Sequence, residues 1–229
     1  MRNFCIEKVF EFLRNGEGGV SAASGDFEKI ANTFERIFQE FIQGEMYKAI
    51  LFLTIIIMDD FSFAEMVKID NAAPEFSMPY YDPASGTDGT LSLEDMSGKW
   101  TVLFYYPADF TFVCPTELKD MADAKAQFDE LGVEVLACST DTVFTHKAWI
   151  DHEKLMENFP YKMLADHNLE TADAYNILDP ETGIAGRGTF IIDPDGVVRG
   201  IEVTSGPLGR NSEELIRKLQ ALQFMRANP

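Results

Sequence analysis

Basic residues are scarce in this sequence. Only 19 lysines and arginines stand against 38 aspartates and glutamates, so the formal net charge is −19 at pH 7. Nucleic acids and anionic membranes bind basic protein surfaces, so this balance argues against both as partners. The apolar run at 49–58 is also shorter than the about 20 residues that a membrane-spanning helix needs. We expect it to be a buried helix or a docking segment.

Cysteine and histidine are almost as rare, with three of each. An odd, sparse set of cysteines does not make a disulfide framework. The sequence has no C-x-x-C, which excludes a thioredoxin-type dithiol site and a zinc ribbon by spacing. No metal or cofactor is therefore expected. The first fifteen residues lack the continuous apolar stretch of a secretory signal, so we expect a reducing cytoplasm.

Residues 1–65 differ in pattern from the rest of the chain. Two stretches of apolar residues at helical spacing flank a loop at 16–25 that is rich in Gly, Ser and Ala. They predict a helical appendage, whose role stays open between an oligomer-contact arm, a partner-binding helix pair and upstream sequence read from the wrong start. Met66, where the second pattern begins, keeps that last alternative open.

Residues 66–229 alternate between strand and helix patterns, which predicts one three-layer α/β domain. A turn-rich link is expected at 91–99. The turn of the terminal hairpin is expected at 193–196, and Asn211 and Glu214 are expected to cap the last helix. The predicted strands lie at 74–81, 101–106, 133–139 and 161–165 and in a hairpin at 188–204, and the predicted helices lie at 114–131, 141–157, 168–175 and 211–225.

Cys114 stands where the buried strand 101–106 leads into a helix. Pro115 suits the first turn of a helix, because its missing N–H has no partner to lose there. Unpaired backbone N–H groups and the helix dipole favour an anion at such a position. The placement therefore predicts a nucleophilic thiolate at Cys114.

Pro107, Thr111 and Cys114 form the pattern P-x-x-x-T-x-x-C, by which this part of the chain resembles the peroxiredoxins. The resemblance is greatest to the alkyl hydroperoxide reductase C and typical two-cysteine group, and it implies a thioredoxin-like fold over roughly 66–229. Four ordered stretches carry it, at 109–117, 144–149, 186–193 and 207–210.

The resemblance also implies a thiol-dependent peroxidase and a role for each site residue. Cys114 would attack the terminal oxygen of a peroxide and become a sulfenic acid. Thr111 would hydrogen-bond the peroxide, and Arg187 would stabilise the thiolate and the leaving oxygen. Glu117 would orient Arg187, and Pro107 would shield the site from water.

The implied partners are a hydroperoxide substrate and a thiol reductant, either a thioredoxin-like protein or a flavin-dependent disulfide reductase. The family also implies a homodimer and a ring of dimers, with the loop that holds Phe110 and Phe112 near a subunit contact. The alternative function is a binding protein, a chaperone or redox relay in which peroxidase turnover is secondary.

The sequence departs from the two-cysteine group at two places. That group has a resolving cysteine beyond a helix like 211–225, whereas this sequence ends at Pro229. Either the biological chain continues or the enzyme works with one cysteine, and the likeness of the last helix to the group favours the first alternative. The group's Gly-Gly-Leu-Gly insertion, which is tied to overoxidation sensitivity, is also absent before Leu164. Its absence predicts resistance to overoxidation, provided that a resolving thiol is available.

The remaining cysteines and histidines have simpler interpretations. Cys138 falls inside an apolar strand and is expected to be inert core. Cys5 lies outside the region of resemblance and is expected to serve packing. His146 and Trp149 share a predicted helix face and are expected to pack near the pocket, not to act in catalysis.

Overall fold

The computed structural model describes residues 67–228. The predicted helices and apolar run of the appendage, and Cys5 with them, lie outside these residues. The strands are β1 (Ser77–Asp82), β2 (Thr87–Ser92), β3 (Trp100–Tyr105), β4 (Val133–Ser139), β5 (Lys162–Ala165), β6 (Leu178–Asp179), β7 (Ile184–Ala185), β8 (Arg187–Ile192) and β9 (Val198–Thr204). The helices are η1 (Glu94–Met96), α4 (Cys114–Asp123), α5 (Lys125–Glu130), α6 (Val143–His152), η2 (Lys154–Met156), α7 (Glu170–Ala174) and α8 (Ser212–Ala227).

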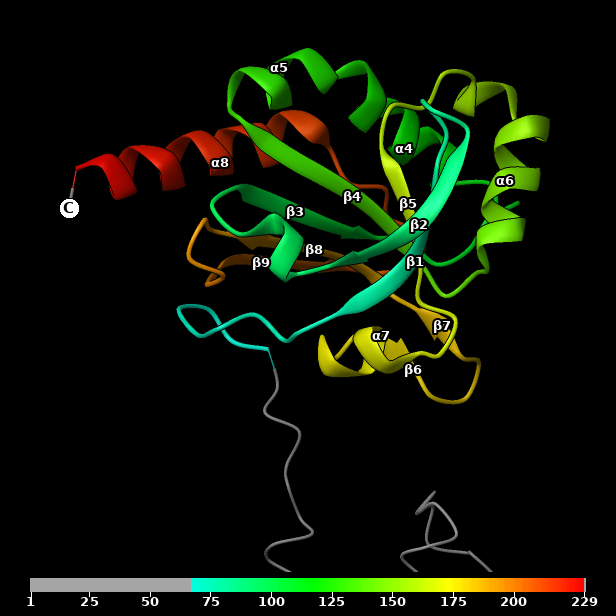
Figure 1. The fold of residues 1–229 in the computed structure, drawn as a ribbon, viewed down its shortest axis with the longest axis horizontal. Coiled ribbons are helices and arrows are strands. Elements are labelled where there is room, and N and C mark those ends of the chain that lie inside the picture. The colour runs from blue at the N-terminus through cyan, green and yellow to red at the C-terminus, as the bar shows by residue number, and fades with distance from the viewer. Residues whose placement is uncertain (1–66, 229) are drawn as a thin grey trace, which may run out of the picture. The chain divides into compact units, whose positions relative to one another are not determined.

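A seven-stranded mixed sheet forms the centre of this domain, in the order β2-β1-β5-β4-β3-β8-β9 (Figure 1). Strands β3, β4 and β5 are parallel, and β8 and β1 pair antiparallel to β3 and β5. Parallel neighbours buried on both faces read as continuous apolar runs, which is why β3 and β4 are evident in the sequence. The predicted α/β architecture of the thioredoxin-like type is confirmed.

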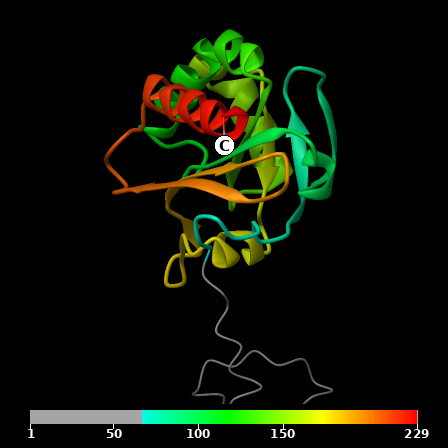
Figure 2. The same cartoon turned by 90° about the vertical axis from the view of Figure 1, so that its left-hand side faces the viewer.

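Each face of the sheet supports its own apolar core, because alternate residues of a strand point to opposite sides. One core holds Val102 and Phe104 of β3 with side chains of α4, α5 and α8. The other holds Leu103 and Tyr105 with side chains of η1 and α7. Figure 2 shows α8 and α4–α5 on one side of the sheet and α7 on the other, which gives the three predicted layers.

Several predicted boundaries were wrong. The helix expected at 114–131 is broken at Ala124, and the two pieces α4 and α5 both turn an apolar side chain, Met121 and Phe128, into the same core. The helix expected at 141–157 ends at His152, because Glu153 is extended and its side chain caps η2 by accepting from the Leu155 N–H.

Two strand pairs were missed. β2 overlaps the start of the expected link at 91–99, and the short pair β6–β7 was not expected. The terminal hairpin is confirmed, with Gly196 at a φ of 76° in its turn. The Asn211 cap on α8 is confirmed as well, since its side chain accepts from the Glu214 N–H. The Glu214 carboxylate does not complete the expected reciprocal cap, because it pairs with Arg217.

Candidate active site

Cys114 is the first residue of α4 and is fully buried, with Pro115 directly after it. The chain reaches it from the carboxyl end of β3 through the turn at 106–113. No side chain caps the start of α4. The helix therefore directs the partial positive charge of its first turn at the cysteine, which stabilises negative charge there.

Arg187, the first residue of β8, reaches the same sulfur. Its Nη1 donates to Cys114 Sγ at 3.4 Å and also to the Glu117 carboxylate, while its Nε donates to the Gly206 carbonyl at 2.6 Å. The guanidinium is held at both ends and is 4% exposed. A fixed cation at this distance stabilises negative charge on the sulfur and on any oxygen bound next to it.

Glu117 lies one turn after Cys114 on α4 and is also buried. One carboxylate oxygen accepts from Arg187, and the other accepts from the backbone N–H of Arg210 at 2.8 Å and from its Nε at 3.0 Å. The structure thus brings Glu117 and Arg187 together beside Cys114. The single carboxylate bridges two arginines, which neutralises part of their combined charge.

Arg210 was missed as a site residue, although it belongs to one of the stretches that carry the family resemblance. Its guanidinium centre lies 3.6 Å from the centre of the Phe104 ring, and its Nη1 donates to the Gly188 carbonyl and to Thr189 Oγ1. Burial lowers the pKa of Arg210 below its ordinary value. No local pattern marks it, because its contact with Glu117 joins residues 93 positions apart.

Pro107 and Thr111 lie in the turn that precedes Cys114, and both are partly buried. Thr111 Oγ1 donates to the Ala108 carbonyl at 2.9 Å. Within residues 67–228, Thr111 makes no hydrogen bond to the Cys114 sulfur. Phe110, which directly precedes Thr111, has a φ of 55°, a left-handed conformation that is uncommon outside glycine. The turn is therefore a constrained one, and it leads directly into Cys114.

Cys138 is placed far less favourably for chemistry. It lies in β4, fully buried, in the core on the sheet face opposite to Cys114. Burial raises the pKa of the Cys138 thiol well above its ordinary value, which disfavours the reactive thiolate. Its sulfur contacts Met78 Sδ at 3.8 Å. The expectation of a buried core position is confirmed.

A polar cluster lies beneath the Cys114 turn. His146 of α6 is fully buried, and its Nδ1 lies 2.8 Å from Asp109 Oδ2. The Tyr106 hydroxyl donates to the other Asp109 oxygen at 2.8 Å. Desolvation raises the pKa of Asp109 above its ordinary value, against the opposing influence of His146. His146 is packed as expected, but it also carries a buried hydrogen-bond network that the sequence did not suggest.

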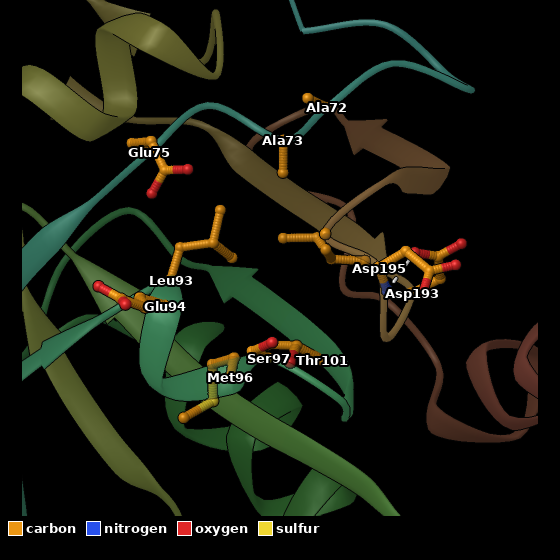
Figure 3. Close-up of a pocket in the computed structure, with 12 residues that line it drawn as sticks. Ala72, Ala73, Glu75, Leu93, Glu94, Met96, Ser97, Thr101, Asp193 and Asp195 are labelled. Carbon is orange, nitrogen blue, oxygen red and sulfur yellow. Dashed lines mark hydrogen bonds between the residues drawn. The ribbon is translucent and has the colours of Figure 1, made fainter.

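The pocket in Figure 3 is separate from this site. It has a volume of about 450 Å³ and is lined by residues that include Glu75, Glu94 and Asp193. Thr101, near the start of β3, also lines it, whereas Cys114 follows the other end of that strand. Its acidic lining contains no nucleophilic sulfur, so it offers no route for chemistry at Cys114.

Residues 67–228 contain no group of three or more His, Cys, Asp or Glu side chains that could hold a metal ion. In the same part of the chain, no helix combines the length and the apolar character needed to cross a membrane. The polar groups around Cys114 are an arginine pair and a carboxylate, a set that suits an anion or a peroxide oxygen more than a cation.

A thioredoxin-like sheet that presents a buried cysteine at a helix start, under a fixed arginine, defines the peroxiredoxin class of thiol peroxidases. Residues 69–201 match the family described as AhpC/TSA. The chain belongs to that family.

Individual relatives agree with this assignment. Alkyl hydroperoxide reductase C of Staphylococcus epidermidis is 45% identical over 154 residues, which cover 67% of this chain and 82% of that protein. The crystal structure of Enterococcus faecalis AhpC superimposes with a TM-score of 0.68 at 41% identity, covering 71% of this chain and 96% of that one. The reduced Plasmodium vivax 2-Cys peroxiredoxin gives a TM-score of 0.67 at 30% identity, covering 70% and 84%.

Proposed function

We propose that Cys114 is the peroxidatic cysteine of this thiol-dependent peroxidase, which reduces hydrogen peroxide and alkyl hydroperoxides. The observation that carries the proposal is the contact between Arg187 Nη1 and Cys114 Sγ at 3.4 Å, made at the first residue of α4. Two positive groups, a guanidinium and a helix start, act on one sulfur. That arrangement stabilises negative charge on the sulfur that attacks the peroxide.

In the first step the Cys114 thiolate attacks the terminal oxygen of the hydroperoxide. The S–O bond forms as the O–O bond breaks, so sulfur is oxidised to a sulfenic acid and the peroxide is reduced to an alcohol or water. Arg187 stabilises the negative charge that develops on the departing oxygen. Because Glu117 and Gly206 hold this arginine from two sides, little reorganisation is needed when that charge appears.

Thr111 and Pro107 complete the proposed site. The Thr111 hydroxyl donates a hydrogen bond to the Ala108 carbonyl, which leaves its oxygen lone pairs to accept a hydrogen bond from a peroxide O–H. Pro107 has no backbone N–H and offers an apolar ring at the start of the turn, which limits the access of water to the sulfur.

In the second step a thiol condenses with the sulfenic acid to give a disulfide and water, and a further thiol then releases Cys114. The full burial of Cys114 means that a protein-sized reductant reaches it only after the turn opens. Cys138 lies on the other sheet face and is poorly placed to resolve it. The reductant we propose is a thioredoxin-like protein or a flavin-dependent disulfide reductase, in the cytoplasm.

We further propose that residues 66–229 form one domain, distinct from the appendage 1–65, and assemble as a homodimer and a ring of dimers. Phe110 and Phe112 in the Cys114 turn are 55% and 97% exposed, and Phe144 at the start of α6 is 84% exposed. Exposed apolar side chains that gather in a patch mark interaction surfaces, and Phe110 and Phe112 lie two residues apart in one turn. A subunit contact there would support the turn that holds the nucleophile.

The peroxidase proposal is tested by following the loss of hydrogen peroxide and of an alkyl hydroperoxide in the presence of dithiothreitol. Repeated turnover with both substrates is expected. If the protein suppresses aggregation of a denatured client but turns over neither peroxide, the alternative of a binding protein is correct.

The assembly proposal is tested by light scattering on the reduced and the oxidised protein. Phe112→Ser is expected to reduce the mass of the assembly, whereas Phe224→Ser, a change at an exposed aromatic residue of α8, serves as the matched control. A monomer in both redox states of the unaltered protein would count against the proposal.

A further inference from the structure

In the buried cluster of Tyr106, Asp109 and His146, the hydrogen-bond geometry indicates how many protons Asp109 and His146 hold between them. His146 Nε2 lies 3.1 Å from the Leu164 carbonyl oxygen, which can only accept a hydrogen bond. Nε2 must therefore carry a hydrogen. On the other side of the ring, Nδ1 faces the Asp109 carboxyl group at 2.8 Å, and a hydrogen bond there also needs a proton.

Two arrangements satisfy both contacts. Either His146 is an imidazolium that donates to the Asp109 carboxylate, or a protonated Asp109 donates to a neutral His146. In both arrangements the pair has no net charge and shares one proton across the 2.8 Å contact. The Tyr106 hydroxyl donates to the second Asp109 oxygen, so it does not replace that proton, and its 3.4 Å approach to Nδ1 is the longer contact.

The shared proton lies where the turn before Cys114 is attached to the rest of the domain. Asp109 belongs to the turn that leads to Cys114, and its backbone N–H donates to Asp141 Oδ2 at 2.9 Å. Through Asp109, the turn is thus tied to α6 by the side chain and to the loop between β4 and α6 by the backbone. Asp141 is the other carboxylate near the pair, and it is itself held by the Ser139 hydroxyl at 2.8 Å.

We propose that the proton shared by Asp109 and His146 locks the Cys114 turn in place, which makes His146 a positioning residue for the peroxidase reaction. The inference rests on the proposed function of Cys114. The raised pKa of Asp109 agrees with a carboxyl group that keeps or shares a proton in this buried place. An isolated carboxylate there would be a buried unpaired charge, which strongly favours opening of the turn to water.

Two substitutions of Asp109 are expected to have different effects, because only one of them preserves the hydrogen-bond network. Asp109→Asn supplies an amide N–H where the shared proton was and keeps an oxygen for Tyr106, so the network remains satisfied. Asp109→Leu has a similar size and removes both side-chain hydrogen bonds, to His146 and to Tyr106, while the backbone contact with Asp141 remains possible. We expect Asp109→Asn to lower the single-turnover rate constant of Cys114 with hydrogen peroxide by about threefold or less, and Asp109→Leu by about tenfold or more, because small misplacements of a reacting group cost that much.

His146→Asn is the test on the other side of the pair. The asparagine amide can donate a hydrogen bond to Asp109 or to Leu164, but it cannot transfer a proton to the Asp109 carboxylate. We therefore expect the single-turnover rate constant to fall by about tenfold or more. His167→Asn is the matched control, because that exposed histidine lies outside the cluster. The direct sign of the shared proton is a low-field imidazole N–H resonance in the proton NMR spectrum, present in the unaltered protein and lost in His146→Asn but not in His167→Asn.

Hydrogen exchange separates this proposal from the proposed function. If the proton locks the turn, the amides of residues 109–114 exchange faster in His146→Asn and Asp109→Leu than in Asp109→Asn, whether or not the protein turns over peroxide. Equal effects of Asp109→Asn and Asp109→Leu on this exchange, or a nitrogen NMR spectrum that shows His146 Nε2 without a proton, would overturn the inference. A protein that reacts with no peroxide but shows the expected exchange pattern would refute the peroxidase function alone.

Discussion

Replacing Glu117 with glutamine should damage both the stability and the chemistry of the site. Glu117 accepts from Arg187 through one oxygen and from Arg210 through the other, and all three side chains are at most 4% exposed. The glutamine amide keeps one acceptor, but its NH₂ group then faces an arginine N–H. Two buried guanidinium groups also lose the carboxylate that they share.

The size of the effect follows from burial. Breaking a buried ion pair by removing one partner costs about 3–5 kcal/mol, since the remaining charge has no compensation. We take the lower end, about 3 kcal/mol, because the amide oxygen of the introduced glutamine still accepts one hydrogen bond. For a domain of this size each kcal/mol corresponds to about 2–4 °C in Tm, which predicts a decrease of about 6–12 °C.

The assay is thermal unfolding of the reduced protein together with single-turnover oxidation by hydrogen peroxide. Glu214→Gln is the control. Its hydrogen bond to Arg217 lowers the pKa of Glu214 to about 2, yet the pair is exposed and is expected to leave Tm close to the unaltered value. If Glu117→Gln changed neither Tm nor the oxidation rate, the role of Glu117 as the bridge between two buried arginines would be refuted.

Three further predictions concern other contacts. Arg187→Met should lower the rate constant for peroxide reduction about 100-fold, as the loss of one charge-stabilising donor does in other enzymes. Stopped-flow kinetics at several peroxide concentrations measure this rate constant, and an unchanged value would contradict the role of Arg187. Burial raises the pKa of Asp166, so this carboxyl group binds a proton more readily in the folded state, and the stability that this contributes is lost as pH rises from about 4 through the folded pKa. In urea unfolding, the free energy of unfolding of Asp166→Asn should therefore decline less over that pH range than that of the unaltered protein. Parallel pH profiles of the two proteins would contradict this. Asn211→Ala should reduce the free energy of unfolding by about 1 kcal/mol, because it removes the acceptor for the Glu214 N–H at the start of α8, and an unchanged urea midpoint would count against that cap.

The parts of the fold that the sequence predicts are those that local pattern determines. β3 and β4 are mostly apolar and almost entirely buried, and the turn before β9 is marked by Gly196. β2 was missed because only Leu91 of its six residues is buried, so its place depends on backbone pairing with β1 and not on an apolar pattern. No glycine or proline marks the break between α4 and α5 in the sequence. The break depends on tertiary packing, because both helices place apolar side chains in one core.

The same distinction holds for the site. Cys114 is recognisable from its position between a strand and a helix start, and the family resemblance supplies Arg187. Arg210 and the Asp109–His146 pair depend on contacts across 93 and 37 positions of the chain. Such contacts exist only after the strands of the sheet have paired, so spacing along the sequence cannot indicate them.

Cys114 is the residue that we expect peroxide to oxidise. The most direct measurement exposes the reduced protein to one equivalent of hydrogen peroxide, traps sulfenic acid with dimedone and maps the label by mass spectrometry. We expect the label on Cys114, no peroxide consumption by Cys114→Ser, and nearly full activity of Cys138→Ser, whose thiol lies in the core on the other sheet face. A label on Cys5 or Cys138, or substantial turnover by Cys114→Ser, would contradict it.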